Sequence, residues 1–321
     1  MRRREFIAGV LLTGMMRRVQ AQPSGKLVRI GVLMAEPFQP LQSLRQELHR
    51  LGYVEGRNLR FEYCFAEHGD DQYPTLASEL VALDVDLIVT FGTPATLAAK
   101  RATATIPIVI CGIAEALSTG VVSNLARPGG NITGFTSLSF DLESKRLELL
   151  REIVPRLSRL GVLASATNPY TSVFMPHFRS DAEALGLMVE FVTVRDKDDL
   201  EAGLQRLAGA RPDAAFVVTD ALLYSRPKQI AAFMVEHRLP AMFGFRGYAE
   251  AGGLIAYSAD QNKLFRRAAG YVDRILKGDR PGDLPVQQAT EFELVINLRT
   301  ARALSIEIPP SLIARVDEVI E

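Results

Sequence analysis

Polar side chains that follow apolar, β-branched runs are the residues of this sequence best placed to do chemistry. In residues 91–96, Phe-Gly-Thr-Pro-Ala-Thr, Thr93 is expected to cap the following helix while Pro94 occupies its first turn. The first backbone N–H groups of a helix have no partner within it, so they can bind a carboxylate or another anion. The segment therefore predicts an anion-binding site beside Thr93.

Comparable residues follow the other predicted strands and supply the remaining chemistry of a small-ligand site. Acids suit an ammonium group, hydroxyl and amide groups suit a carboxylate, and aromatic faces suit an apolar side chain. Together they fit a zwitterion such as an amino acid, and a few polar groups in an apolar cleft are typical of such sites. The candidate ligand-binding residues are Glu36, Thr93, Glu115, Asn168, Tyr170, Asp220, Phe245, Arg246 and Tyr257.

The sequence lacks the common signatures of catalysis and of cofactor binding. It has no G-x-G-x-x-G fingerprint, no Walker loop and no G-x-S-x-G elbow, and its four histidines lack the i, i+4 spacing of a helical zinc pair. The acidic pairs Asp70-Asp71 and Asp198-Asp199 are interpreted as solvated helix starts that complement the helix dipole. We therefore expect neither an enzyme nor a bound cofactor or metal.

Overall composition narrows the class of protein and of partner. The 321 residues are 48% hydrophobic and 23% charged, which is typical of a globular chain long enough for two domains. Lysine and arginine total 37, and aspartate and glutamate also total 37, so no net charge favours nucleic acid as a partner. We expect Cys64 and Cys111 to be buried free thiols, with a disulfide as the alternative in an oxidising compartment.

The first 21 residues are typical of an export signal. A basic start precedes an apolar run from Ala8 to Met16, and a small residue precedes an expected cleavage site near Ala21. Residues 3–7, Arg-Arg-Glu-Phe-Ile, resemble the core of the twin-arginine signal, and an ordinary secretion signal is the alternative. The mature chain is therefore expected in the periplasm, since no later stretch is apolar enough to span a bilayer.

Alternating strands and helices are expected to position the candidate residues. The predicted strands are residues 28–34, 58–65, 87–91, 107–111 and 132–135 in the first half, and 160–164, 188–194, 214–219, 241–245 and 253–257 in the second. The predicted helices are residues 39–51, 73–83, one from Pro94, 117–125, 142–154, 172–185, 200–208 and 227–237. The pattern predicts an α/β fold of two doubly wound, parallel-sheet lobes, with a ligand cleft between their facing carboxyl edges.

Several longer stretches resemble the ABC transporter substrate-binding protein family, whose better understood members bind tryptophan, phenylalanine or tyrosine. The stretches are residues 2–7, 52–58, 92–95, 125–134, 145–150, 251–254, 274–278, 292–298 and 308–312. The resemblance covers essentially the whole chain. It implies a type I periplasmic binding protein fold, in which two lobes are joined by three crossings and close on a ligand about a hinge.

The resemblance also implies the division of the chain and its partners. The first lobe would comprise residues 25–136 and 260–278, and the second 137–259 and 286–321, with crossings at 136–139, 258–260 and 284–288. The partners would be a small-molecule solute and an ABC permease in the inner membrane, with the receptor a monomer or a weak dimer. A sensory protein that docks to a chemoreceptor or kinase is the alternative, and an exported enzyme a weaker one.

On closure, the resemblance implies that residues of the two lobes face each other across the ligand. Thr93 and neighbouring amides would hold a carboxylate, and Asp220 or Glu115 an ammonium group. Arg246 would pair either with the ligand or within its own lobe. Phe245, Tyr170 or Tyr224 would flank a side chain, and Glu36, Thr93 and Glu115 would face Asn168, Asp220, Phe245 and Tyr257. Relatives often have Asp-Pro where this chain has Glu115-Ala116, so ligand position is expected to differ there.

Overall fold

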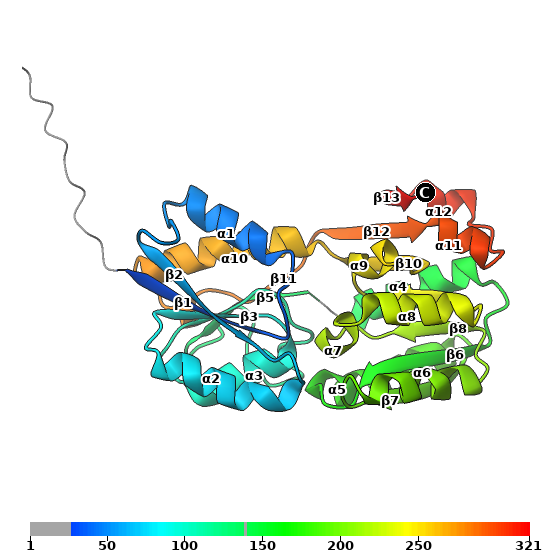
Figure 1. Cartoon of the computed structure of the whole chain (residues 1–321), viewed down its shortest axis with the longest axis horizontal. Coiled ribbons are helices and arrows are strands. Elements are labelled where there is room, and N and C mark those ends of the chain that lie inside the picture. The colour runs from blue at the N-terminus through cyan, green and yellow to red at the C-terminus, as the bar shows by residue number, and fades with distance from the viewer. Residues whose placement is uncertain (1–26, 138–139) are drawn as a thin grey trace, which may run out of the picture.

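In the computed structural model the chain forms two lobes side by side, each built around its own sheet (Figure 1). The structure describes residues 27–137 and 140–321. The predicted export signal, residues 1–21, lies outside the described residues, as do the first two residues assigned to the first lobe and part of the crossing at 136–139.

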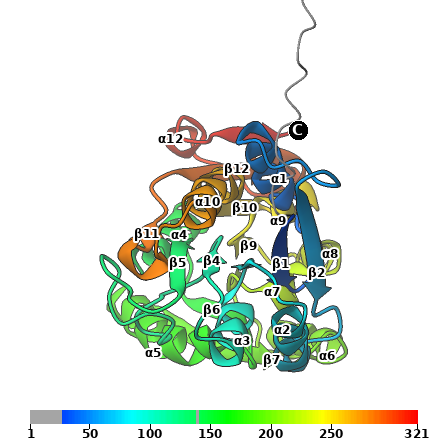
Figure 2. The same ribbon diagram turned by 90° about the vertical axis from the view of Figure 1, so that its left-hand side faces the viewer.

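The first lobe contains a six-stranded parallel sheet in the order β11-β5-β4-β3-β1-β2. Helices α1 (Leu41–Arg50) and α10 (Gln261–Leu276) cover one face, and α2 (Tyr73–Ala82) and α3 (Thr93–Ala102) the other (Figure 2). The central strands β3 and β4 are wholly buried because helices cover both faces. The strands are β1 (Val28–Met34), β2 (Leu59–Phe65), β3 (Leu87–Thr90), β4 (Ile108–Ile110), β5 (Ile132–Thr136) and β11 (Gln287–Gln288).

The second lobe contains a seven-stranded sheet in the order β13-β12-β10-β9-β8-β6-β7, in which only β12 and β10 pair antiparallel among the described strands. Its strands are β6 (Arg159–Ser165), β7 (Met188–Val194), β8 (Ala214–Val217), β9 (Ala241–Phe243), β10 (Ile255–Ala259), β12 (Phe292–Asn297) and β13 (Glu318–Ile320). One face packs against α4 (Phe140–Ile153), α5 (Pro169–Ala184), α11 (Leu298–Ala303) and α12 (Pro310–Ile313). The other packs against α6 (Asp199–Gly209), α7 (Ala221–Tyr224), α8 (Pro227–Glu236) and α9 (Arg246–Glu250).

The chain passes between the lobes three times, after β5, after β10 and after β11. The last crossing begins later than the resemblance implies, because Gln287 and Gln288 pair with Phe135 and Thr136 of β5 and so extend the first sheet. The hydroxyl of Tyr271 on α10 accepts from the Gln287 side chain at 2.8 Å and donates to the Pro285 carbonyl at 2.9 Å. This segment therefore belongs to the first lobe.

All ten predicted strands are confirmed, whereas the helix predicted for residues 117–125 is wrong. The chain makes a single turn there, in which the Thr119 N–H and hydroxyl both donate to the Glu115 carbonyl. Gly120 then adopts a φ of +72°, and the Val121 N–H donates back to the Ala116 carbonyl. A glycine in this left-handed conformation ends a helical turn, so the apolar residues beyond it are free to pack on the sheet.

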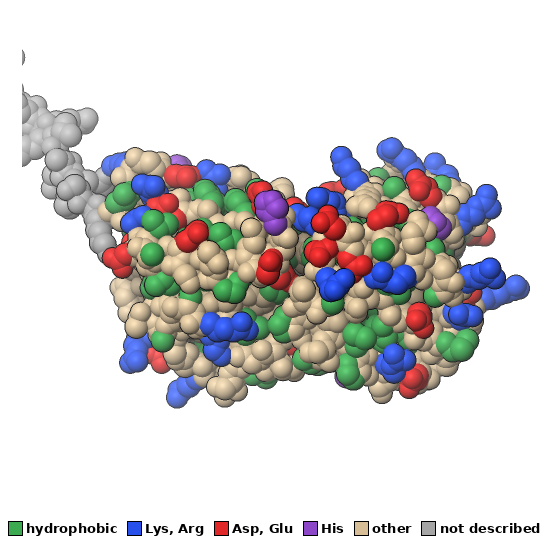
Figure 3. All heavy atoms as spheres, turned by 60° about the horizontal axis from the view of Figure 1, so that its bottom comes forward, with side chains coloured by type: hydrophobic (Ala, Val, Ile, Leu, Met, Phe, Trp, Pro, Cys, Tyr) green, Lys and Arg blue, Asp and Glu red, His purple; other side chains and the backbone are tan. Residues whose placement is uncertain are grey.

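Both cysteines are buried and unpaired, as expected, with Cys64 8% and Cys111 0% exposed. Burial raises the pKa of both thiols. Among the described residues, no helix has the length and apolarity needed to cross a bilayer. On the face drawn in Figure 3, basic and acidic side chains are interspersed, in keeping with the balanced charge of the sequence.

Gly134 is the residue of β5 that lets this strand approach β4. Its φ is +130°, and a Cβ built there would lie 2.2 Å from the Ile110 carbonyl oxygen. We expect Gly134→Ala to lower the free energy of unfolding by about 1–3 kcal/mol, measured by urea unfolding. Gly270→Ala is the control, because no atom lies within 4 Å of a Cβ at this helical position and alanine favours helix. Unchanged stability of the first variant would contradict the argument.

Candidate functional site

The carboxyl ends of strands from both sheets meet at the boundary between the lobes. A cavity of about 30 Å³ lies there, large enough for about two water molecules but not for an amino acid. Of the predicted site residues, Thr93 lines it from the first lobe, and Asn168, Asp220 and Phe245 line it from the second. The structure thus brings four of the nine candidates to one place between the lobes.

The start of α3 forms the first-lobe side of this cavity. The helix begins at Thr93 and its N-cap is Gly92, whose φ is +92°, so the prediction that the Thr93 side chain caps the helix is wrong. The Thr96 hydroxyl instead donates to the Gly92 carbonyl at 2.9 Å and pairs with the Thr90 hydroxyl at 2.8 Å. The Thr93 hydroxyl, 2% exposed, makes no hydrogen bond within the described residues and stays available beside the free N–H groups of the helix.

Asp220 forms the second-lobe side and is 5% exposed. Its Oδ1 accepts from the N–H groups of Leu222 and Leu223 at 2.7 and 3.2 Å and so caps α7. Its Oδ2 accepts from Asn168 Nδ2 at 2.7 Å, while Asn168 Oδ1 caps α5. Burial, and secondarily the charge of Asp70, raise the pKa of Asp220 to about 6. No cation offsets this carboxylate among the side chains that the structure describes around it, so it suits the ammonium group of a ligand.

Asp70 stands at a helix start, as interpreted, but it is only partly exposed to solvent and also contacts the other lobe. It lies in the short 3₁₀ helix η1 (Asp70–Gln72), and its Oδ2 accepts from the Thr167 hydroxyl of the other lobe at 2.7 Å. Burial raises the pKa of Asp70, and burial together with the charge of Asp70 raises the pKa of Tyr73. Two carboxylates, Asp70 and Asp220, therefore belong to opposite lobes and interact electrostatically across the cleft.

Two further hydrogen bonds join the lobes. Lys197 Nζ donates to the Glu67 carbonyl at 2.5 Å, and the Phe140 N–H at the start of α4 donates to Glu115 Oε1 at 3.1 Å. Glu115 is thus a contact between the lobes rather than a lining residue of the cavity, and burial raises its pKa. Burial also raises the pKa of Glu36, against the charges of Lys197 and Arg226, at the edge of the same boundary.

Tyr170 and Tyr257 do not reach the cavity. Tyr170 is fully buried in the second lobe, where its ring packs near Phe140 and Phe174, because the cap made by Asn168 places it in the first turn of α5. The ring of Tyr257 packs near Phe292 at 5.8 Å, since alternation along β10 turns it away from the lobe boundary.

Arg246 pairs within its own lobe, which was one of the two predicted outcomes. Its guanidinium contacts Glu250 at 2.6 Å, Glu293 at 3.2 Å and Glu318 at 2.5 Å. It lines a second, larger pocket of about 420 Å³ beside the cavity, together with Phe38, Tyr224 and Phe245. Three of the five N–H donors of Arg246 are thus engaged by carboxylates of its own lobe.

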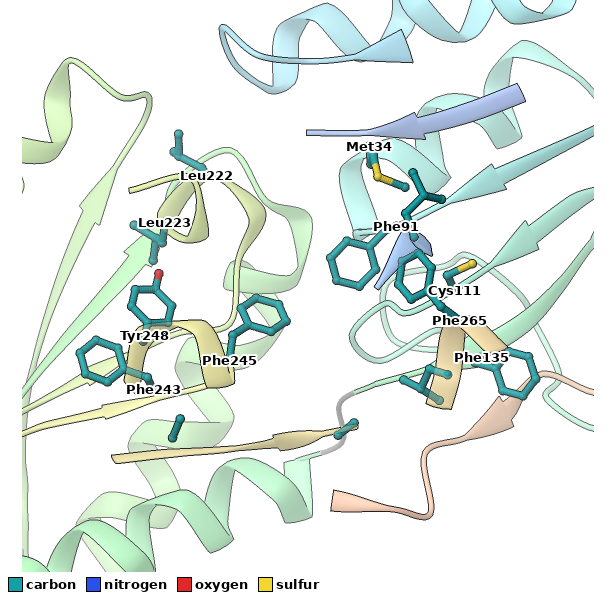
Figure 4. Packing of buried hydrophobic residues seen from close by; sticks show 14 of the residues in the cluster. Met34, Phe91, Cys111, Phe135, Leu222, Leu223, Phe243, Phe245, Tyr248 and Phe265 are labelled. Atoms are coloured by element: carbon teal, nitrogen blue, oxygen red, sulfur yellow. The ribbon is translucent and has the colours of Figure 1, made fainter. Parts of the chain in front are cut away.

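Aromatic rings of both lobes meet between the cavity and the larger pocket. Phe91 and Phe265 come from the first lobe and face Phe245 of the second (Figure 4). Phe38, which the sequence analysis missed, stacks on Phe91 at 4.7 Å and lies within 6.0 Å of Phe245. Phe38 follows β1 at the same sheet edge as Thr93, and this position in the sequence could have identified it as a candidate site residue.

Arg146 is a second residue that the sequence analysis missed. It is 1% exposed and donates to Glu143 and the Thr219 hydroxyl at 2.9 Å, and to the carbonyls of Tyr257 and Gly244 at 2.6 and 3.3 Å. Thr219 and Gly244 follow the ends of β8 and β9, and Tyr257 lies within β10. The residue therefore fixes the strand ends that carry Asp220 and Phe245.

Comparison with known proteins places this geometry in a family. The family model described as ABC transporter substrate binding protein matches residues 38–320. A tyrosine-binding protein from Clostridioides difficile (strain R20291) is 27% identical over 257 residues, which are 80% of this chain and 73% of that protein.

Solved structures agree with this match. A conserved domain protein from Vibrio cholerae superposes with a TM-score of 0.86 at 28% identity, over 92% of this chain and 100% of that chain. A protein from Streptococcus pneumonia, solved in complex with L-Trp, superposes with a TM-score of 0.84 at 26% identity, over 91% of this chain and 99% of that chain. The fold is that of type I periplasmic binding proteins.

Proposed function

The chain belongs to the ABC transporter substrate-binding protein family, and from that premise we propose that it is a periplasmic receptor for an amino acid, preferentially an aromatic one. It closes its two lobes on the solute and delivers it to a permease in the inner membrane. Two similar proteins support this solute class: the one from C. difficile is a tyrosine-binding protein, and the one from S. pneumonia was solved in complex with L-Trp.

One observation carries the assignment of an amino acid. The start of α3 with Thr93 and the buried carboxylate of Asp220 stand on opposite lobes and line the same cavity. The start of α3 suits a carboxylate because of its free N–H groups. The Asp220 carboxylate suits an ammonium group because it is buried and no described cation lies beside it. A zwitterion bound between them would connect the lobes and stabilise the closed state.

The contacts between the lobes support closure as the working motion. Thr167 with Asp70, Lys197 with Glu67, and Phe140 with Glu115 are hydrogen bonds that form only when the lobes approach. Since the cavity of about 30 Å³ has no room for an amino acid, the lobes must open before a solute enters. The three crossing segments are the proposed hinge, and the closed receptor with its solute is the form that the permease would recognise.

A thermal unfolding panel on residues 22–321 tests the proposal. Each of the common amino acids, small peptides and organic acids is added in turn, and a ligand at about 100 times its Kd should stabilise the protein by about 2.7 kcal/mol. We expect the largest shift with an aromatic amino acid. A panel in which organic acids shift the melting temperature and amino acids do not would overturn the amino-acid assignment.

Thr93→Val is expected to weaken amino-acid binding about 3–10-fold, because it removes one hydroxyl donor without changing the size of the side chain. Isothermal titration with the best ligand of the panel measures the change. Thr75→Val is the matched control, since Thr75 is exposed on α2, and its affinity should equal that of the unaltered protein. Equal affinities of both variants would remove Thr93 from the site.

A further inference from the structure

Phe38 lies between the two spaces at the lobe boundary. Phe91 and Phe245 line the cavity of about 30 Å³, whereas Phe38, Tyr224 and Phe245 line the pocket of about 420 Å³. Phe245 borders both, and the stack of Phe38 on Phe91, with an interplanar angle of 22°, stands beside it. The stacked pair of Phe38 and Phe91 therefore stands between a space lined by the polar groups of the proposed amino-acid site and a space large enough for a side chain.

The neighbours of the Phe38 ring form an aromatic box. Besides the stacked face of Phe91, it meets the edges of Tyr224, Phe245 and Phe265 at centroid distances of 5.5, 6.0 and 5.8 Å. One stacked and several edge-on partners are the arrangement that aromatic rings prefer. The partners come from both lobes, so whatever ring fills this box helps to hold the lobes together.

Phe38 is held in the box by packing alone. It belongs to the segment between β1 and α1, its ring is half-buried, and the flanking Pro37 and Gln39 are exposed. Its carbonyl accepts from the Leu41 N–H at 2.9 Å, a bond that does not depend on the side-chain torsions. The ring can therefore leave the box by rotation of its side chain while this backbone hydrogen bond stays intact.

We propose that the Phe38 ring occupies the place taken by the ring of an aromatic solute, and that it turns further into the larger pocket when such a solute binds. Phe38 is thus a specificity-determining residue that competes with aromatic rings. The placement of the solute's carboxylate and ammonium groups rests on the proposed function. The site for its ring rests only on the aromatic contacts of Phe38.

The test uses Phe38→Ala and two fluorescent probes, L-tryptophan and indole. The chain contains no tryptophan, so the fluorescence of either probe, excited at the red edge where tyrosine does not absorb, reports its own binding without background from protein tryptophan. We expect both probes to bind Phe38→Ala about tenfold more tightly than the unaltered protein, because the competing ring is gone. L-alanine, which carries no ring, should bind both proteins equally in a titration calorimeter.

Two variants serve as controls. Tyr63→Ala removes an exposed ring of β2 that stacks near Phe61 and Phe65, and it should leave both affinities unchanged. Phe38→Leu keeps an apolar side chain in case the alanine variant unfolds, and it should bind both probes more tightly than the unaltered protein.

The outcomes separate this inference from the proposed function. If Phe38 were a wall of the site, both probes would bind the variants more weakly, which would overturn the inference and leave the amino-acid receptor intact. Tighter indole binding without any tryptophan binding would support the ring site and overturn the amino-acid assignment. Absence of binding of both probes to every variant would overturn the ring site.

Discussion

Replacing Arg146 with methionine is expected to lower the free energy of unfolding by about 3–5 kcal/mol. Arg146 and Glu143 form a buried ion pair at 2.9 Å, with 1% and 2% of their side chains exposed. Methionine leaves the Glu143 carboxylate buried without its cation, beside the buried Tyr170 hydroxyl. It also leaves the Thr219 hydroxyl and the Tyr257 and Gly244 carbonyls without a donor. Urea unfolding followed by circular dichroism measures the loss.

Two further variants show whether the charge or the shape of Arg146 matters. The double variant Glu143→Leu with Arg146→Met should recover much of the stability, because it removes both buried charges together. Lys145→Met is the matched control on the same helix. Lys145 is 43% exposed and its ion pair with Glu148 is a surface pair, so a change within about 0.5 kcal/mol is expected. A loss below about 1 kcal/mol for Arg146→Met would show that the network does not hold the strand ends.

The sequence predicts the elements of this fold well because burial imposes a period on each. Residues 87–90 are four apolar or β-branched residues in a row, and β3 is buried along its whole length. Leu41, Leu44 and Leu48 repeat at helical spacing and are the residues that α1 buries. Since both lobes repeat the same strand and helix alternation, the two-sheet architecture followed from local pattern alone.

The site was harder to predict because it depends on contacts between distant residues. Asp70 looks solvated in its own segment, and only Thr167, 97 residues later, makes it part of the cleft. Arg146 lies at helical spacing from the buried Leu142 and Leu150, which indicates its buried face, but its acceptors beyond α4 lie 73 to 111 residues later and no local pattern reveals them. Tyr170 was expected in the cleft because it follows β6, but it falls within α5, whose buried face turns it into the core.

Asp220 should make solute binding depend on pH in a direction that identifies it. Its pKa of about 6 lies above the ordinary value of 3.8, because the charged form is buried without a cation. An ammonium group bound beside it favours the charged carboxylate, so binding below pH 6 must release a proton. The affinity for an amino acid should therefore fall about tenfold between pH 7 and pH 5, and stay constant between pH 7 and pH 8.

The stability of the empty protein should change with the opposite sign. Because the folded-state pKa of Asp220 is raised, this group favours folding below pH 4, and its contribution is lost as the pH rises through about 6. Acid unfolding of the whole molecule would instead weaken both stability and binding as the pH falls. Opposite trends in the two measurements thus point to buried carboxylates such as Asp220 rather than to a general effect of acid.

Asp220→Asn should abolish the pH dependence of binding and weaken amino-acid binding about 10–100-fold, since it removes the charge that faces the ammonium group. The asparagine Oδ1 can keep the cap of α7, whereas its NH2 group would face the Asn168 NH2 group and lose that hydrogen bond, so circular dichroism must confirm that the variant is folded. Asp70→Asn removes the neighbouring charge that raises the pKa of Asp220, and it should move the midpoint of the binding profile below pH 6. Calorimetry at pH 5 to 8, in two buffers of different ionisation enthalpy, measures affinity and proton release together. An unchanged affinity of Asp220→Asn at pH 7 would place the ammonium group elsewhere. The two acids of the cleft would then act on closure of the lobes alone.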